Sequence, residues 1–180
     1  MVLAEHKYHI DSVLFSADGH WLAVTSGVTV WLWPIPVSDS VTEPIILRGH
    51  TSWIRDAAFS PDGHWLATGS YDGTTRIWDI KASDPAKDPI ILNANEFWVS
   101  ELMFSPDGHW LATAGCDEIR AAGSCVEGMV RLWNLTLSDP SLKPKVLQGH
   151  KRWFGALIFS PDGHWLATGG CDKTQRSCIV

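Results

Sequence analysis

The segment "FSPDGHWLATGSYDG" at residues 59–73 occurs four times along this 180-residue chain with small changes. "FSADGHWLAV" begins at Phe15, "FSPDGHWLATAG" at Phe104 and "FSPDGHWLATGG" at Phe159, so that successive copies lie 44, 45 and 55 residues apart. The longest interval is the ordinary period with ten added residues, Glu118 to Glu127. Such a period indicates a repeat architecture, in which each copy is one supersecondary unit that packs on its neighbours.

The second copy shows most clearly what one unit builds. Three short apolar segments, "WIRDAAF", "HWLATGS" and "TTRIWDI", are separated by the turn sequences "SPDG" and "YDGT", and "PIILRGH" leads into the next unit. These segments are too short for helices and are interrupted by Pro, Asp and Gly, which favours strands joined by tight turns. Each unit is therefore predicted to form a four-stranded antiparallel sheet within one domain, residues 1–180. The approximate units are 1–44, 45–89, 90–144 and 145–180.

Four motifs of the second unit recur at the same spacing and carry a family resemblance. They are the Gly49-His50 pair, the "SPDG" turn, Ser70-x-Asp72 and Trp78-Asp79. Together they resemble the WD-repeat β-propeller family, in its bacterial type with four tandem repeats. The resemblance implies an all-β propeller of four-stranded antiparallel blades around a central channel, whose usual role is to hold other proteins.

The last unit departs from this pattern. Its closing tryptophan is replaced by Cys178, and the sequence given ends after the third predicted strand. We therefore expect four repeats with the last one truncated, in a partial or unusually small ring. The stretch "VLAEH" at residues 2–6 matches the end of a fourth strand; in one alternative it completes the last blade and closes a four-bladed ring, but it is short and the family usually builds larger rings. An open array would expose apolar faces, so self-association or completion by further repeats is also predicted.

Composition and charge narrow the classes of partner. The formal net charge is −6 and no basic run occurs, which argues against binding to nucleic acid or to an anionic membrane. The first ten residues lack the apolar core of a signal peptide, so a cytoplasmic location is expected. Histidines follow the Asp-Gly turns at positions 20, 64, 109 and 164. They belong to separate blades, too far apart to share an ion, so neither a metal nor a cofactor is predicted.

The cysteines are expected to be free thiols. Four of them at this length, without a CxxC pair, do not suggest a disulfide scaffold. Cys116 and Cys125 flank much of the ten-residue insertion, and a clip between them is the less favoured alternative.

The resemblance also assigns a structural role to four residues of the second unit. In the family, the matching residues form a buried relay from aspartate to histidine, from histidine to serine and from serine to the tryptophan indole. Here these residues are His50, Ser70, Asp72 and Trp78. The same set suggests a nucleophilic triad, but catalysis also needs an exposed nucleophile and an oxyanion site, for which the sequence offers no motif. The relay is therefore predicted to stabilise the blade.

A binding face is predicted where the loop before the first strand of each unit meets the turn between its second and third strands. Residues at these places project around the channel mouth in the family. Here they are His9, Trp53, Arg55, Tyr71, Trp98, Ser100 and Trp153. Tryptophan, tyrosine and arginine dominate the energetics of protein interfaces. The alternative is that the tryptophans pack between blades, as Trp65, Trp110 and Trp165 are expected to do.

The sequence thus predicts a non-enzymatic scaffold or recognition module that binds proteins. Bacterial relatives often carry such repeats beside kinase, protease-like or nucleotide-switch domains, which suggests a part of a larger regulator. The alternative is a small propeller enzyme with an active site in the central channel, since the fold alone does not exclude catalysis.

Overall fold

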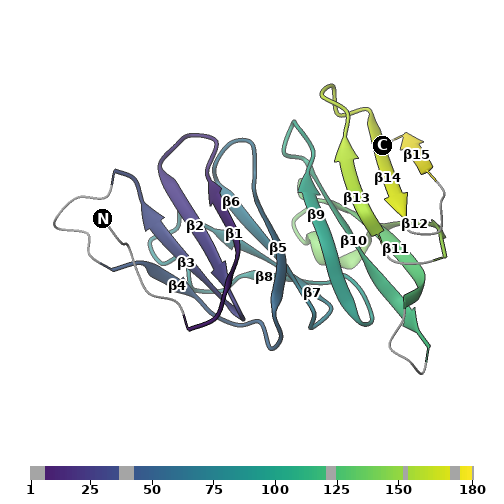
Figure 1. Ribbon diagram of the computed structural model, residues 1–180. Coiled ribbons are helices and arrows are strands. Elements are labelled where there is room, and N and C mark those ends of the chain that lie inside the picture. Colours follow the sequence, from purple (N-terminus) through teal and green to yellow (C-terminus); the bar gives the residue numbers. More distant parts are fainter. Residues whose placement is uncertain (1–6, 37–42, 121–124, 152–153, 171–174, 180) are drawn as a thin grey trace.

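The computed structural model describes residues 7–36, 43–120, 125–151, 154–170 and 175–179, which form four antiparallel sheets in a row (Figure 1). We call these sheets blades one to four. Blade one contains β1 (Ile10–Phe15), β2 (Trp21–Ser26), β3 (Thr29–Pro34) and β4 (Ile45–Leu47). Blade two contains β5 (Ile54–Phe59), β6 (Trp65–Ser70), β7 (Thr74–Asp79) and β8 (Ile90–Asn93).

The last two blades follow the same order. Blade three contains β9 (Trp98–Phe104), β10 (Trp110–Ile119), β11 (Cys125–Asn134) and β12 (Lys145–His150), with a short 3-10 helix at Pro140–Leu142 before its last strand. Blade four contains β13 (Phe154–Phe159), β14 (Trp165–Gly170) and β15 (Gln175–Ile179). Neighbouring strands in each sheet are consecutive in the sequence, so the predicted all-β meander of each unit is confirmed. No helix within the described ranges is long and apolar enough to cross a membrane.

The turn between the first and second strands of each blade is formed by the repeated Ser-x-Asp-Gly sequence. In blade two, the Ser60 hydroxyl donates to the Asp62 carboxylate at 2.5 Å and accepts from the backbone N–H of Trp65 at 2.9 Å. The Asp62 carboxylate also accepts from the N–H of His64 at 3.0 Å. Gly63 has a φ of 63°, a left-handed conformation that glycine adopts at little cost. The serine–aspartate hydrogen bond recurs in the other three turns. The repeated sequence therefore specifies a tight turn whose polar groups are hydrogen-bonded to one another.

Apolar side chains fill the junctions between blades. Ile54, Leu66 and Trp78 of blade two pack against Ala23 and Leu32 of blade one. Equivalent clusters lie between blades two and three and between blades three and four. The tryptophans that close the third strands are almost completely buried in blades one to three. The core is therefore a series of similar junctions, as expected of a repeat protein whose units contact only their neighbours.

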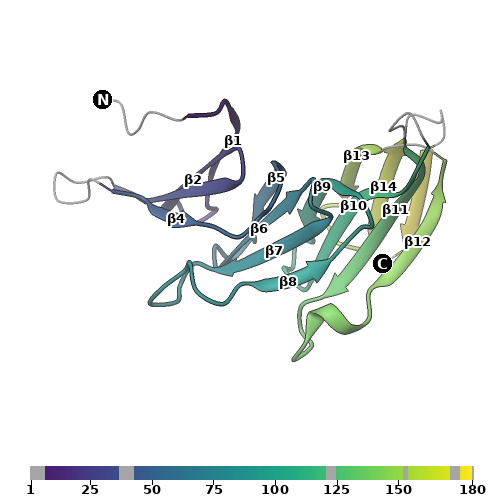
Figure 2. The same cartoon turned by 90° about the horizontal axis from the view of Figure 1, so that it is seen from below.

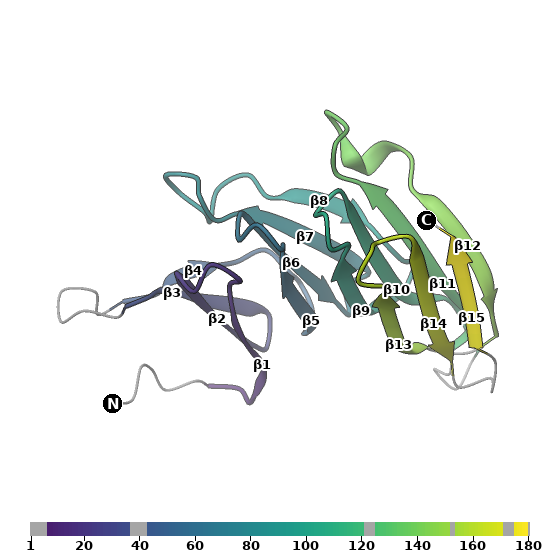
Figure 3. The same ribbon diagram turned by 90° about the horizontal axis from the view of Figure 1, so that it is seen from above.

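The blades form an open arc. The inner strands β1, β5, β9 and β13 lie side by side in chain order (Figure 2). Blades one and four lie at opposite ends of the row in every view (Figure 3). The described part of the chain is thus a partial propeller whose last blade has three strands. The predicted completion of that blade by residues 2–6 lies outside the described residues.

The ten-residue insertion extends blade three. β10 and β11 each run for ten residues, and they remain paired out to Ile119 and Cys125. Cys116 and Cys125 form a disulfide, with their Cα atoms 5.8 Å apart. The prediction of free thiols is therefore wrong for this pair, and the clip is present. The reason is the lengthened ladder, which folds the insertion back as a hairpin and brings both cysteines within the range that a disulfide spans.

Candidate functional site

A buried polar relay links the loop, the turn and the core of blade two. His50 Nδ1 lies 3.0 Å from the Asp72 carboxylate, and His50 Nε2 lies 2.8 Å from the Thr68 hydroxyl. The Trp78 indole N–H donates to the same Thr68 hydroxyl at 3.1 Å. A carboxylate can only accept, so Nδ1 carries a proton. With a neutral imidazole, the Thr68 hydroxyl then donates to Nε2 while it accepts from the indole.

The relay confirms the contact between Asp72 and His50 but corrects its third member. The prediction that Ser70 joins His50 to Trp78 is wrong, because Ser70 donates to the carbonyl of Ser52 at 2.9 Å and accepts from the N–H of Asp72. Ser70 lies at the end of β6, beside the turn, whereas Thr68 lies two residues deeper in the strand. A signal was present in the sequence, since the threonine recurs as Thr113 and Thr168 while Ser70 is replaced by glycine in the same two units.

The electrostatics of the relay suit a structural role. Burial alone would raise the pKa of Asp72, but hydrogen bonds from His50, from the Thr74 hydroxyl and from the N–H groups of Thr51 and Thr74 hold it well below its usual range. The carboxylate is thus ionised and fully engaged. The His50 side chain is only 1% exposed, so no substrate can reach it and the triad interpretation fails.

The other blades keep only parts of this arrangement. In blade three, Asp117 accepts from the Asn95 amide at 2.7 Å and pairs with Arg131 at 2.5 Å, while the indole of Trp133 donates to Thr113 at 3.0 Å. In blade four, His150 Nε2 lies 2.9 Å from the Thr168 hydroxyl. Blade one has Val24 at the threonine position. The aspartate–histidine–threonine–tryptophan relay is therefore observed in full in blade two, within the described residues.

A row of aromatic rings lies at the same end of the blades. Its members sit in the loops before β1, β5 and β9, at the first position of β9 or in the turn after β6. We call them the aromatic row: Tyr8, His9, Trp53, Tyr71, Phe97 and Trp98. The His9 and Trp53 rings are 4.9 Å apart at their centroids, and those of Tyr71 and Trp98 are 6.3 Å apart. Edge-to-face contacts of this kind fix the rings relative to one another.

Backbone hydrogen bonds explain why residues from different repeats share this end. The N–H of Tyr71 donates to the carbonyl of Trp53 at 2.9 Å, which holds the turn of blade two against its own entry loop. Between blades, the N–H of Ile54 donates to Gly27 and that of Asn95 to Gly73, so each entry loop is tied to the turn of the preceding blade. The rings therefore form two contacting groups, one around Trp53 and one around Trp98, which the hydrogen bond between Tyr71 and Trp53 holds next to each other.

The aromatic row is exposed except for the half-buried Trp98, unlike the core tryptophans. Tyr8 is 47% exposed, Trp53 42% and Tyr71 45%, whereas Trp78 is 1% exposed. The alternative that these rings are buried between blades therefore fails for Trp53, whose place in the loop keeps it outside the junction. Packing against junction clusters is observed for Trp65 and Trp110, but the same expectation is wrong for Trp165, which is 48% exposed.

Three further residues were predicted to belong to the binding face: Arg55, Ser100 and Trp153. Arg55 is exposed beside the row, but the Ser100 hydroxyl is committed to the carbonyl of Ala114 at 3.1 Å. Trp153 lies outside the described residues. Tyr8 and Phe97 were not predicted, although each directly precedes a predicted face residue in the same loop.

An acidic pair lies behind the row at the junction of blades two and three. The Asp56 carboxylate accepts from the N–H of Leu102, in the next blade, at 2.8 Å. Burial raises the pKa of Asp56 to about 6, despite this hydrogen bond, and the neighbouring Glu101 carboxylate adds to the rise. Burial also raises the pKa of Glu101, which Arg55 partly offsets. The hydrogen bond to Leu102 joins the two blades, whereas ionisation of the buried carboxylate costs stability at this junction.

Each turn histidine lies beside an aspartate. His20, His109 and His164 each pair with the aspartate of their own turn, while His64 lies 3.0 Å from Asp79. Across the described ranges, no group of three or more histidine, cysteine, aspartate or glutamate side chains is arranged to hold an ion.

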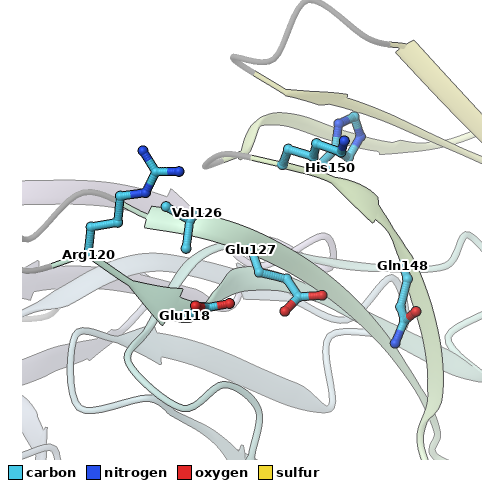
Figure 4. Close-up of a pocket in the computed structure, with 7 residues that line it drawn as sticks. Glu118, Arg120, Val126, Glu127, Gln148 and His150 are labelled. Carbon is cyan, nitrogen blue, oxygen red and sulfur yellow. The ribbon is translucent and has the colours of Figure 1, made fainter.

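An open hollow lies beside the hairpin of blade three that contains the Cys116–Cys125 disulfide. It measures about 550 Å³ and is lined by seven residues: Glu118, Arg120, Val126, Glu127, Gln148, His150 and Lys151. Figure 4 shows that the Arg120 side chain extends away from the carboxylate of Glu127. His150 is committed to Thr168. The ionisable groups thus line the rim without converging on one point, which does not favour the enzyme alternative.

Comparison with known proteins agrees with the fold. The family described as WD domain, G-beta repeat, matches residues 42–79, 89–134 and 142–174. This chain belongs to the WD-repeat family. It is also 40% identical over 57 residues to the DDB1- and CUL4-associated factor 13 of Dictyostelium discoideum. That match covers 31% of this chain and 12% of the relative, so the chain corresponds to a small part of that protein's length. Both findings favour a module that interacts with proteins.

Proposed function

We propose that this chain is a non-enzymatic recognition module that docks a protein partner on the aromatic row. The observation that carries the proposal is the exposure of several large rings at one end of neighbouring blades, while the tryptophans that close the third strands are buried. Contiguous exposed apolar surface of this kind commonly marks an interaction site.

The chemistry of the row suits a protein partner. Rigid aromatic side chains contribute large contact areas at a small cost in conformational entropy, and they are enriched at interface hot spots. Arg55 and Lys7 lie beside the rings, with Lys7 Nζ 5.5 Å from the centre of the Tyr8 ring. A partner segment with an apolar anchor and a flanking carboxylate would complement this surface.

The relative named above supports the same coarse role. Its printed name describes a protein that associates with DDB1 and CUL4. By analogy, we propose that the present chain recognises a protein for a larger assembly. The cytoplasmic location expected from the sequence stays a prediction. The thiol state of Cys116 and Cys125 in protein from the source cell bears on it, because reducing compartments keep such pairs open.

The proposal is tested with a photo-crosslinking amino acid at Tyr71 in the full chain, expressed in the source cell. We expect it to capture a discrete protein, which is then purified and titrated against the chain. Each of Trp53→Ala and Trp98→Ala should weaken that binding by at least about 30-fold if the residue is a hot spot.

The control variant is Leu137→Ala, which removes a side chain 48% exposed in the linker between β11 and β12. It should bind as the unmodified chain does. Equal losses for Leu137→Ala and Trp53→Ala would contradict docking on the row. The same is true if the captured protein binds both tryptophan variants with unchanged affinity.

A further inference from the structure

Blade one presents an apolar face that its counterparts bury. Ile10 is 49% exposed, Val13 56% and Phe15 66%. In blade three the equivalent residues are Val99, Leu102 and Phe104, all at most 6% exposed. In blade four they are Phe154, Leu157 and Phe159, all at most 7% exposed. The side chains of blades three and four are covered by the blade before them, so this face of blade one has the composition of one half of a blade junction.

Blade four presents the other half. Ile158 is 58% exposed and Trp165 is 48% exposed, and Ala167 is exposed as well. The counterparts of Ala167 in the preceding blades, Ala23, Ala67 and Ala112, are each 0% exposed. In those three blades the alanine is covered by the following blade. In blade four no described residue covers Ala167 in this way. The two open faces are thus the complementary sides of one junction, at opposite ends of the arc (Figure 3).

The junction of blades two and three shows how closely these sides fit. At Gly69 in blade two, an added Cβ would lie 2.6 Å from Val99 Cγ1, so the glycine is what allows blade three to approach. Blade four keeps a glycine at this position, Gly169, whose added Cβ would meet only the Cβ of Ala156, at 3.5 Å. Ile10 of blade one is the counterpart of Val99. The surface beside Gly169 therefore matches the exposed Ile10 side chain in the way that Gly69 matches Val99.

The turns between the first and second strands of successive blades show the same complementarity. An added Cβ at Gly108 would meet Pro61 of the preceding turn at 3.9 Å, and one at Gly163 would meet Pro106 at 3.7 Å. At Gly19, the first turn, no described atom lies within 4 Å. Pro161, in the last turn, is the residue that would fill this place in a continued array.

We propose that blade four of one copy packs on blade one of a second copy as successive blades pack within the chain. The occupant is a second copy because this chain carries both halves of the junction, each with the side chains that the other half accepts. Since the halves differ, the contact is heterologous, and two copies close when the second junction forms in the same way. The resulting ring has eight blades, at the upper end of the usual range. This inference concerns the ends of the arc and is independent of the aromatic row.

Sedimentation of the purified 180-residue chain over a range of concentrations tests the proposal. We expect a species of twice the chain mass of 19.9 kDa. Phe15→Glu, on the blade-one face, and Ile158→Glu, on the blade-four face, should each raise the dissociation constant at least about 30-fold, because a charge is then buried in an apolar contact. Both positions are exposed in the single chain, so the variant monomers should keep their melting transitions.

Mixing the two variants gives the sharper test. The variant Phe15→Glu retains an intact blade-four face and Ile158→Glu retains an intact blade-one face, so an equimolar mixture should form a heterodimer through one unmodified junction. Association lost in only one variant, or not restored by mixing, would overturn the head-to-tail arrangement. A concentration-independent monomer would overturn the proposal and leave further repeats or another protein as the occupant. Tyr71→Ala, on the aromatic row, should leave self-association unchanged.

Discussion

The relay of blade two offers a direct test of how this fold is stabilised. Asp72 accepts from His50, from the N–H groups of Thr51 and Thr74, and from the Thr74 hydroxyl, at distances between 2.6 and 3.0 Å. The substitution Asp72→Ala removes all four acceptor contacts at once and adds no bulk.

The magnitude follows from what each donor can do afterwards. The N–H of Thr51 is exposed and regains a bond to water, so its loss costs little. His50 Nδ1 is buried, and its remaining neighbour is the Thr74 hydroxyl at 3.3 Å. Stranding a buried donor costs about 1–3 kcal/mol, and loss of the bonds that shape the turn adds about 1 kcal/mol. We therefore expect the free energy of unfolding to fall by about 2–4 kcal/mol, equivalent to roughly 4–15 °C in melting temperature.

Differential scanning calorimetry and urea denaturation measure this loss. The matched control is Glu96→Ala, which removes an exposed carboxylate from the neighbouring entry loop and should change stability by less than about 0.5 kcal/mol. Thr68→Val should destabilise by a similar amount to Asp72→Ala, because it removes the hydroxyl that joins His50 to Trp78. If Asp72→Ala melts as the unmodified chain does, the relay contributes nothing and the reasoning is refuted.

Stability should also depend on pH through Asp56, whose pKa is raised to about 6 mainly by burial. Because the folded value lies above the unfolded one, the folded state binds the extra proton, and the free energy of unfolding should fall by about 1–3 kcal/mol as pH rises from about 4 to about 7. Asp56→Asn keeps an acceptor for the N–H of Leu102 and should flatten that slope in urea titrations; an unchanged slope would assign it to other groups. Reduction of the disulfide between Cys116 and Cys125, which are 9 residues apart, should lower the free energy of unfolding by about 2–3 kcal/mol. Equal melting curves with and without reductant would contradict this. Finally, binding through the aromatic row should persist when salt is raised from about 0.15 to about 0.5 M, since screening weakens chiefly exposed charge pairs. Complete loss of binding in that titration would indicate an electrostatic docking mode instead.

The repeated phrase was sufficient to predict the blades, because every contact that shapes its turn is local. Ser60, Asp62 and Gly63 lie within four residues of one another, and their hydrogen bonds depend only on the backbone that they themselves bend. The same holds for the strand order, in which each strand pairs with the next in the sequence. The face that carries Trp53 and Tyr71 could also be predicted, since the loop and turn positions of a repeated unit are equivalent from blade to blade.

Some contacts depend on how far along its strand a residue lies, or on a partner far away in the sequence. These contacts could not be predicted from the repeated sequence. Thr68 and Ser70 carry the same functional group two residues apart, and only the position of the His50 ring in three dimensions decided which hydroxyl it meets. The disulfide depended on how the paired strands of the insertion fold back, a matter of ladder geometry and not of cysteine spacing.

The sequence by itself determined that the chain forms WD-type blades, because a local period of strands and turns is encoded within each copy. The tertiary structure decided which apolar residues remain exposed. Phe15 and Phe159 occupy the same place in the repeat, yet one is 66% exposed and the other 6%. The difference arises because burial in a blade junction depends on the neighbouring blade as much as on the residue, and a repeat unit does not specify its own neighbours.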